Sequence, residues 1–501
     1  MKKYVFCLCL CVLFLLLPLF TSCRGDGGAD TNTEPNTTTT AEDTATSNRY
    51  DLEPKNMPHD EKLLICGVNI TSYRIVYGRS PLTRRASNTG KTIGDDIDSL
   101  MQGTETACDF DFQTAIRLRD LIKQYYNYDV EVVNDSDAKH ESRYEILVGY
   151  TDRYASSEAK KALKDSADRF KVEPNPYSTS KEMTQYLVCG GSYGATWHAV
   201  DEIEKFLKGN QNSTTTDLST LKQDNGQYDF TVVACVGDSI TRGSQAFPDG
   251  PYANSTGIAA KFGPIAAPIY LEQYLSYPAT MQRELWKDAI VYNFGRGAST
   301  ARNYGNDQYY AGSEQFKKCL DTSNSNIDFD IVFLMHGTND SGMEGGAQNW
   351  SEASKANFKS EIKNQIDKIR EGSPNASFVL NLVPHACNEV SSSSERENKE
   401  AVRTIQKSLA KDLKDAGYQI RLFDMETFMI ENLSSDGKCG SNQTDEWAAH
   451  EAYYNVKTDT GSRDPLHPNY RGYGMMAQGL IKVVDHLVNN APATKYMISI
   501  E

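Results

Sequence analysis

The sequence predicts an α/β protein whose C-terminal half contains a parallel β-sheet. Short apolar runs rich in β-branched residues alternate with longer segments in which apolar residues recur at helical spacing. Such alternation is typical of parallel strands joined by right-handed crossovers. Length supports the same interpretation, because residues 228–490 of the 501-residue chain suffice for one such domain and leave room for a smaller α+β domain before it.

The chain begins with features of an exported protein. Two lysines follow Met1 and precede an apolar run at residues 4–20, as in a secretory signal peptide. The segment Phe20-Thr21-Ser22-Cys23 is similar to a bacterial lipobox, although leucine is more usual than Phe20. We therefore expect residues 1–23 to be a lipoprotein signal peptide and Cys23 to carry a lipid that anchors the protein at the bacterial cell surface. A simple cleaved signal or an uncleaved anchor is the alternative.

Composition limits the partners and indicates unstructured segments. The net charge of −15 and the pI near 5.1 argue against nucleic acid or an anionic membrane surface as a partner, because no basic cluster is present for phosphates. Residues 24–49 are mostly small and polar, and residues 209–227 are rich in Asn, Ser, Thr and Asp. We expect a disordered linker at 24–49, a second linker at 209–227 and a short C-terminal tail at 491–501.

Residues 50–208 are expected to form the smaller accessory domain. The predicted strands are 63–66, 73–77, 130–133, 144–149 and 185–191, and the predicted helices lie around 115–122 and 199–207. This order predicts helices on one side of a sheet. The phrases Glu145–Arg153 and Gly190–Ala199 resemble the hexosaminidase-like accessory domain that precedes the catalytic barrel in some glycosidases, but no barrel follows here.

The C-terminal domain, residues 228–490, contains five expected strands. They are 231–236, 290–294, 329–335, 377–383 and 419–423. Helical stretches at 277–286, 352–370 and 397–416 separate most of them, and the last has Val402, Ile405, Leu409 and Leu413 at helical spacing. Because parallel strands place their carboxyl ends at one edge of the sheet, polar residues that follow these strands are expected to meet in one crevice.

Four segments carry the polar residues that acyl transfer needs. They are Gly237-Asp238-Ser239 after the first strand, the turn Asn293–Thr300 after the second, Gly337-Thr338-Asn339-Asp340 after the third, and Asp464-Pro465-Leu466-His467 in a terminal loop. A Gly-Asp-Ser sequence alone is also ordinary turn chemistry. The three later segments therefore favour the interpretation of Ser239 as a nucleophile.

Each of these groups has a chemical role. Ser239 needs a base, and the imidazole of His467 can accept the hydroxyl proton near neutral pH and return it to the leaving alcohol. Asp464 would hold that imidazole in the right tautomer, and residues three apart on a helical turn are neighbours, so one segment can supply both groups. We expect the oxyanion to bind the backbone N–H of Ser239, a backbone N–H from the Gly297 turn and the side-chain amide of Asn339.

Together the four segments resemble the SGNH (GDSL-type) hydrolases and occur in that family's order. The resemblance implies a flavodoxin-like, three-layer α/β/α domain around the five-stranded parallel sheet, and ester hydrolysis by a serine nucleophile without a metal or cofactor. An ungapped alignment from Asn293 places Ala298, rather than Gly297, where the family's second-block glycine often falls. The donor there is a backbone N–H, so either residue can supply it. The segment Gly237–Thr241 lacks the trailing glycine of a nucleophile elbow, which argues against the α/β-hydrolase fold.

Histidines near these segments also have simpler interpretations. Asp464 and His467 could also be read as a pair of metal ligands. No further His or Cys lies nearby at ligand spacing, which argues against that interpretation. His336 and His385 follow apolar strands, where a histidine either lines the pocket or is packed, so neither enters the predicted catalytic set.

Three further residues leave alternatives open, and a fourth, Asp340, has one expected role. Arg296 either contacts a substrate oxygen or caps a loop. Trp350 and Trp447 lie in polar segments, where they either stack on a sugar ring or anchor the packing. Asp340 is expected to stabilise the loop that presents Asn339.

The sequence therefore predicts a membrane-anchored serine esterase, with O-acetyl groups on carbohydrate as the favoured substrate. The carbohydrate part rests on the glycosidase-like resemblance and on placement at the cell surface. A lipase or general short-chain esterase is the alternative enzyme. A non-catalytic glycan-binding surface lipoprotein is the alternative of another class, and the presence of Ser239, Asn339, Asp464 and His467 argues against it.

Overall fold

The computed structural model describes residues 62–78, 110–138, 141–163, 166–177, 184–243, 276–301, 310–324, 327–386, 389, 392–433, 454–455, 464–468 and 470–500. The predicted signal peptide with Cys23, the predicted linker at 24–49 and Trp447 lie outside these residues. Within the described ranges, no helix is both long and apolar enough to cross a membrane.

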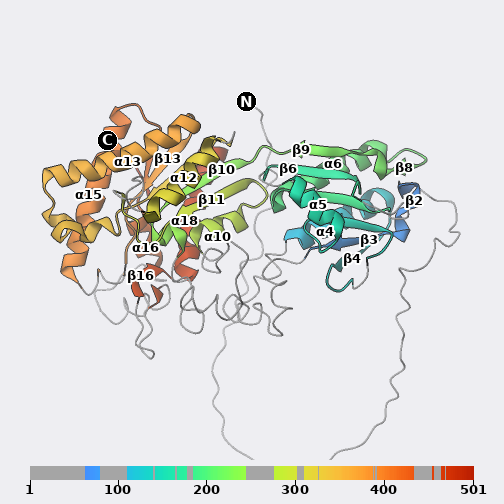
Figure 1. Ribbon diagram of the computed structural model, residues 1–501, viewed down its shortest axis with the longest axis horizontal. Helices are drawn as coiled ribbons and strands as arrows, with labels where there is room; N and C mark the ends of the chain where they lie inside the picture. Colours follow the sequence, from blue (N-terminus) through green and yellow to red (C-terminus); the bar gives the residue numbers. More distant parts are fainter. Residues whose placement is uncertain are drawn as a thin grey trace, which may run out of the picture. The chain divides into compact units, whose positions relative to one another are not determined.

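The C-terminal sheet has, among the described residues, six strands in the order β11-β10-β12-β13-β14-β17. Strands β10, β11 and β13 are labelled in Figure 1. Their bounds are Thr231–Gly237 (β10), Ala289–Gly295 (β11), Ile331–Met335 (β12), Ser377–Asn381 (β13), Ile420–Phe423 (β14) and Met497–Ile498 (β17). The first five in this order are parallel, and β17 pairs antiparallel with β14. The predicted parallel α/β domain is confirmed. The antiparallel edge strand β17 comes from residues that were expected to form the C-terminal tail.

Helices cover both faces of this sheet. Alternate residues of a strand face opposite sides, so Val233 and Cys235 of β10 lie in one core and Ala234 and Val236 in the other. The first core also contains residues of α10 (Tyr277–Glu284), α16 (Met425–Leu433) and α18 (Tyr470–Asn489), and the second contains residues of α12 (Tyr310–Asn324), α13 (Glu352–Gly372) and α15 (Ser393–Asp415). This is the expected three-layer α/β/α architecture.

Helix α15 shows how the local sequence sets these helices. The Ser392 side chain caps its first turn by accepting a hydrogen bond from the Glu395 N–H, 3.3 Å away. The apolar residues that predicted the helix are all buried in the second core: Val402, Ile405, Leu409 and Leu413. The helix begins at Ser393, four residues before the predicted start, because the polar first turn is fixed by the cap rather than by apolar spacing.

The N-terminal sheet has, in the described part of the chain, six strands in the order β4-β3-β5-β7-β6-β9. Their bounds are Arg74–Tyr77 (β3), Glu131–Asn134 (β4), Glu145–Val148 (β5), Arg169–Pro174 (β6), Tyr186–Gly190 (β7) and Gln223–Gln227 (β9). Strands β3, β4, β5 and β7 are parallel, and β6 pairs antiparallel with both β7 and β9.

Helices pack on both faces of the N-terminal sheet, so the expectation of helices on one side was wrong. Helices α4 (Phe110–Tyr126) and α6 (Tyr193–Asn210) contribute Leu118 and Ile203 to the core on one face. Helix α5 (Tyr154–Ala162) covers the other face with Ala155 and Ala159. The apolar residues that α5 buries are small, and the pattern of large apolar residues did not reveal this helix.

The segment expected as the second linker contains short strands. Residues Thr216–Asp217 (β8) pair with β1 (Leu63–Ile65), which also pairs with β2 (Val68–Asn69), and β9 is the edge strand described above. The carboxylate of Asp217 accepts hydrogen bonds from the N–H groups of Cys66, at 3.1 Å, and Gly67, at 2.8 Å. Polar residues thus order this segment through hydrogen bonds, which a search for apolar periodicity does not detect.

Aromatic residues of α4 and α6 contact the segment that follows α10. The Trp286 ring contacts those of Phe110, with centroids 4.7 Å apart, and Trp197, with centroids 5.3 Å apart. The Nε2 atom of His198 lies 2.6 Å from the carbonyl oxygen of Lys287. These contacts join the accessory part of the chain to the start of β11.

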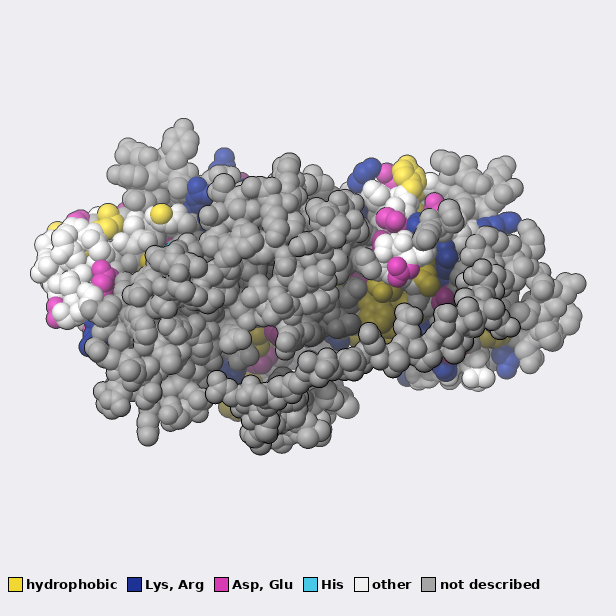
Figure 2. All heavy atoms as spheres, turned by 90° about the horizontal axis from the view of Figure 1, so that it is seen from below, with side chains coloured by type: hydrophobic (Ala, Val, Ile, Leu, Met, Phe, Trp, Pro, Cys, Tyr) yellow, Lys and Arg dark blue, Asp and Glu magenta, His cyan; other side chains and the backbone are white. Residues whose placement is uncertain are grey.

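Charged side chains of both signs are interspersed on the face drawn in Figure 2. Several surface lysines pair with acidic residues, as Lys359 does with Asp412 at 2.8 Å and Lys363 with Asp367 at 2.6 Å. Exposed pairs of this kind add at most about 1 kcal/mol each to stability. The mixture agrees with an acidic chain whose basic residues are interspersed with acidic ones.

Candidate active site

Ser239 lies at the carboxyl edge of the C-terminal sheet, just after β10. Strand β10 is hydrogen-bonded to β11 on one side and to β12 on the other. It ends at Gly237, where a Cβ atom would lie 2.2 Å from Thr241 Oγ1 and 2.5 Å from the Met335 carbonyl oxygen, so only glycine fits. Ser239 then begins the short helix α7 (Ser239–Arg242) and is 6% exposed. The strand therefore delivers a nearly buried hydroxyl to the crevice where the sequence predicts chemistry.

Asp238 fixes the start of α7. Its Oδ1 atom accepts a hydrogen bond from the Ile240 N–H at 2.9 Å, and the side chain is fully buried. Burial raises the pKa of Asp238 to about 6, although the Ile240 N–H, the charge of His467 and the Thr338 hydroxyl each lower it. The carboxyl group thus helps to hold Ser239 at the helix start.

His467 contacts Ser239 directly. Its Nε2 atom lies 2.7 Å from Ser239 Oγ, and the ring is half-buried. This is the distance of a good hydrogen bond, so the serine hydroxyl can donate its proton to the imidazole. The structure therefore brings together the predicted nucleophile and the predicted base.

The segment with Asp464 and His467 is an irregular strand, β16 (Asp464–Pro468), and the expected helical turn was wrong. It pairs antiparallel with β15 (Tyr454–Asn455), with Tyr454 opposite Pro468 and Asn455 opposite Asp464. Residues 465–467 therefore bulge between the two paired positions. Bulges of this kind re-aim side chains beside active sites. The Asp464 side chain lies outside the described residues.

The glycine-rich turn after β11 is fastened to the end of the nucleophile strand. The Arg296 N–H donates a hydrogen bond to the Gly237 carbonyl at 3.0 Å, and the Gly295 N–H donates to Asn293 Oδ1 at 2.9 Å. The Ser299 hydroxyl donates to the Arg296 carbonyl at 2.8 Å. The turn is thereby held at the end of β10, two residues before Ser239.

Ala298, and not Gly297, has the backbone conformation that favours glycine. Its φ angle is +58°, in the left-handed region that costs an L-residue about 1–2 kcal/mol. Gly297 has no such φ, and a Cβ there would lie 3.2 Å from Arg242 Nη1. Ala298 thus has the conformation expected at the position where the ungapped alignment places the family's glycine.

Asn339 contacts the same turn. It follows β12, is half-buried, and its Nδ2 atom donates a hydrogen bond to the Ser299 carbonyl at 2.8 Å. An amide carries two N–H groups, so one donor can hold the turn while the other serves an oxyanion. Asp340 is fully buried, and its Oδ2 atom accepts a hydrogen bond from the Ala301 N–H at 3.0 Å, in keeping with its expected role in the loop. Ser299 was not given a role from the sequence, although it lies within the second segment.

His336 is a core residue. It is 1% exposed, and burial lowers its pKa to about 3 even though Gln365 opposes the shift, so the ring is neutral. Trp350 is likewise a packing anchor, because it is 4% exposed, donates from Nε1 to the Met343 carbonyl at 3.0 Å and packs on Phe358. Neither residue belongs to the site.

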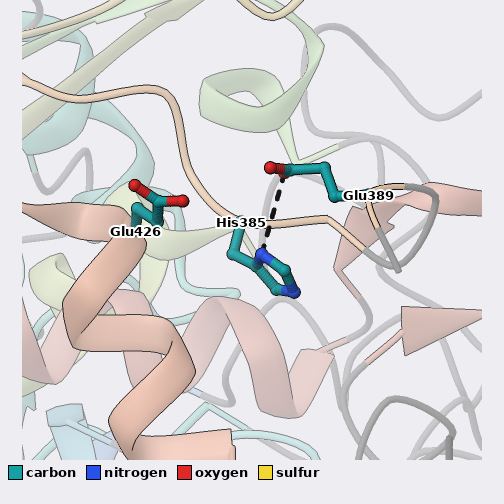
Figure 3. Close-up of side chains that lie close together, drawn as sticks. All are labelled: His385, Glu389 and Glu426. Carbon is teal, nitrogen blue, oxygen red and sulfur yellow. Dashed lines mark ion pairs between the residues drawn. The ribbon is translucent and has the colours of Figure 1, made fainter. Parts of the chain in front are cut away.

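His385 lies beside two carboxylates, Glu389 and Glu426 (Figure 3). The three side chains have atoms close enough to hold a metal ion, and His385 Nδ1 is 3.8 Å from Glu389 Oε1. Arg403 already pairs with both carboxylates, at 3.0 Å from Glu389 and 2.6 Å from Glu426, and Lys399 lies 3.4 Å from Glu389. We interpret this cluster as a buried ion-pair network rather than a metal centre.

Comparison with known proteins identifies the domain. Residues 233–480 match the family model of the GDSL-like Lipase/Acylhydrolase family. No curated protein matches the chain significantly.

Solved structures similar to this chain share little sequence with it. A family two carbohydrate esterase from Clostridium thermocellum in complex with cellohexaose is 16% identical, with a TM-score of 0.32, and the match covers 54% of this chain and 68% of that one. A lipolytic protein of the G-D-S-L family from Veillonella parvula is 15% identical, with a TM-score of 0.30 and coverage of 50% and 97%. The lipase/acylhydrolase from Enterococcus faecalis is 13% identical, with a TM-score of 0.31 and coverage of 53% and 100%. The family-model match shows that residues 233–480 belong to the GDSL-like lipase/acylhydrolase family and form a carboxylic ester hydrolase of the SGNH type.

Proposed function

We propose that this protein is a lipid-anchored esterase of the bacterial cell surface that removes O-acetyl groups from carbohydrate through a Ser239-His467-Asp464 triad. The observation that carries the proposal is the 2.7 Å distance between His467 Nε2 and Ser239 Oγ. A serine hydroxyl becomes an effective nucleophile when a positioned imidazole accepts its proton. The surrounding β10, α7 and β16 supply that positioning.

The proposed reaction has two halves. Ser239 Oγ attacks the acyl carbon while its proton passes to His467 Nε2, which then protonates the departing alcohol. In the second half His467 takes a proton from water, the resulting hydroxide attacks the acyl-enzyme, and Ser239 recovers its proton as acetate leaves. Asp464 is proposed to accept a hydrogen bond from Nδ1 of His467, so that Nε2 faces the serine and the imidazolium is stabilised.

Three donors are proposed for the oxyanion. They are the N–H of Ser239, which lies in the first turn of α7 where helix N–H groups lack intrahelical partners, an N–H of the glycine-rich turn, and the Asn339 amide. Within the turn, the N–H groups of Gly297 and Ala298 both remain candidates for this donor. The bond from Asn339 to Ser299 supports a preorganised arrangement of turn and amide.

The substrate and location rest on sequence features. The predicted signal peptide, Cys23 and polar linker favour a domain held outside the membrane. The resemblance of the accessory domain to a glycosidase module favours a carbohydrate carrier for the ester. A lipase or general short-chain esterase is the rival enzyme, and a non-catalytic glycan-binding lipoprotein is the rival from another class.

The test compares the full chain, purified in detergent, with two active-site variants. Wild-type protein is expected to release acetate from acetylated polysaccharide and to prefer acetyl over long-chain esters, and Ser239→Ala and His467→Ala are expected to lose the activity. Ser360→Ala is the matched control, because Ser360 is exposed on α13. Equal activity in all four proteins would contradict the triad, and a preference for long acyl chains would favour the lipase.

A further inference from the structure

Arg296 is a charged residue beside the proposed nucleophile that the mechanism above does not use. It follows Gly295 at the end of β11, and its backbone N–H donates to the carbonyl of Gly237, two residues before Ser239. Strands β10 and β11 are paired along their whole length up to Gly237 and Gly295. Arg296 thus begins at the same edge of the sheet as the reacting serine.

The guanidinium group of Arg296 is incompletely satisfied. Its Nε atom is buried and has no hydrogen-bond partner among the residues that the structure describes, while the residue as a whole is partly exposed. Native proteins pair nearly all buried polar groups, so an unpaired donor at a site calls for an explanation. A ligand that is bound during function is one such explanation.

Two buried acids of the predicted site segments each accept one backbone hydrogen bond. Asp238 caps α7 through Ile240, and Asp340 accepts the N–H of Ala301. A second arginine lies close by, because Arg242 Nη1 is 3.2 Å from the position that a Cβ on Gly297 would occupy. Two positive residues, Arg296 of the glycine-rich turn and Arg242 of α7, therefore lie at this turn in a chain whose net charge is −15.

We infer that Arg296 binds a carboxylate of the substrate, so that the enzyme acts on esters of acidic sugars such as hexuronides. This inference rests on the proposed carbohydrate esterase function and narrows its substrate class. A guanidinium presents a planar fork of N–H donors that matches a carboxylate in a bidentate pair. The overall negative charge repels such a substrate at long range, so recognition depends on local arginines at the site.

Binding tests the inference without requiring turnover. Calorimetric titration of the full chain in detergent with a methyl hexuronide and with the matching methyl hexoside compares ligands that differ by one carboxylate. We expect the hexuronide to bind wild-type protein at least about tenfold more tightly, which corresponds to one charged hydrogen-bonded pair. Arg296→Gln is expected to remove this preference and Arg296→Lys to restore part of it, whereas Arg421→Gln, at an exposed site on β14, is expected to retain it.

The outcomes separate this inference from the proposed function. Equal binding of the two ligands by wild-type protein, or a preference that survives in Arg296→Gln, overturns the role of Arg296 even if Ser239→Ala abolishes ester hydrolysis. Hydrolysis that is unaffected in Ser239→Ala overturns the proposed mechanism, whatever the sugar binding shows. Thermal unfolding of Arg296→Gln and Arg296→Lys verifies that both variants are folded.

Discussion

The Nε2 atom of His467 lies 2.7 Å from Oγ of Ser239, although the two residues are 228 positions apart in the chain. Strand β10 ends two residues before the serine, and the bulged strand β16 carries the histidine. Both residues are described, but the Asp464 side chain lies outside the described residues. The role of Asp464 is therefore the part of the triad that most needs a direct test.

Asp464→Asn is expected to reduce kcat by about 10³-fold or more, with little change in KM. An asparagine of the same size stabilises the wrong imidazole tautomer and cannot stabilise the imidazolium. Steady-state kinetics on a small acetyl ester measures the effect. Asp485→Asn, at a half-buried position on α18, is the matched control, and a similar loss in that variant would argue against a specific role for Asp464.

Asn339→Ala is expected to lower kcat by about 10²–10³-fold, because it removes one proposed oxyanion donor. The same change deletes the hydrogen bond to the Ser299 carbonyl, so a small loss of thermal stability is also expected. Asn349→Ala is the control, because it removes an exposed amide that donates to the Gly345 carbonyl. If Asn339→Ala reduced stability but left kcat unchanged, the amide would be structural only.

Ala298→Gly is expected to raise the free energy of unfolding by roughly 0.5 kcal/mol. Glycine relieves the left-handed backbone at φ +58°, but it also makes the unfolded chain more flexible, and the two effects partly cancel. Ala298→Val is expected to lower stability by about 1 kcal/mol or more, since a β-branched residue tolerates this conformation poorly. Urea unfolding of both variants checks the prediction, and the reverse order of stability would refute the strain at Ala298.

Asp238 makes stability depend on pH. Its pKa is about 6 in the folded protein against an ordinary 3.8, so the folded state holds the proton more tightly. The resulting stability is fully present below about pH 4 and is lost as pH rises through about 6, by roughly 2–3 kcal/mol. In Asp238→Asn, which keeps an oxygen for the Ile240 N–H, denaturant unfolding at pH 4 and pH 7 should show a smaller fall than in wild type. Burial raises the pKa of Glu426 to about 7, so this residue adds to the fall in stability with rising pH equally in wild type and Asp238→Asn.

Arg403→Met is expected to lower the free energy of unfolding by about 3–5 kcal/mol. The change leaves the buried carboxylate of Glu389 without its arginine partner, and it removes the same partner from Glu426. Adding Glu389→Gln and Glu426→Gln to the same chain should recover part of the loss. Zinc ions are expected to leave the Tm of wild-type protein unchanged, because Arg403 and Lys399 already occupy the carboxylates. A clear rise in Tm with zinc would instead indicate a metal centre.

Strand and helix patterns predicted much of the C-terminal domain. Runs such as 232–236 are apolar throughout, because a strand covered on both faces has no polar side. Strands β6 and β9 were missed, since they are mixed or polar in sequence and are stabilised by pairing with neighbours far along the chain. Helix α5 was missed for the related reason that it buries small apolar residues.

The sequence by itself determined the residue types of the site, their order and their positions at strand ends, because these depend on local chemistry and on the common direction of parallel strands. Only the tertiary structure decided that Asp464–Pro468 is a bulged strand, that Ala298 has a positive φ, and that Asn339 bonds the Ser299 carbonyl. Each of these features depends on pairing and packing between segments that are distant in the chain. Such contacts depend on the order of strands in the sheet, which local propensity does not encode.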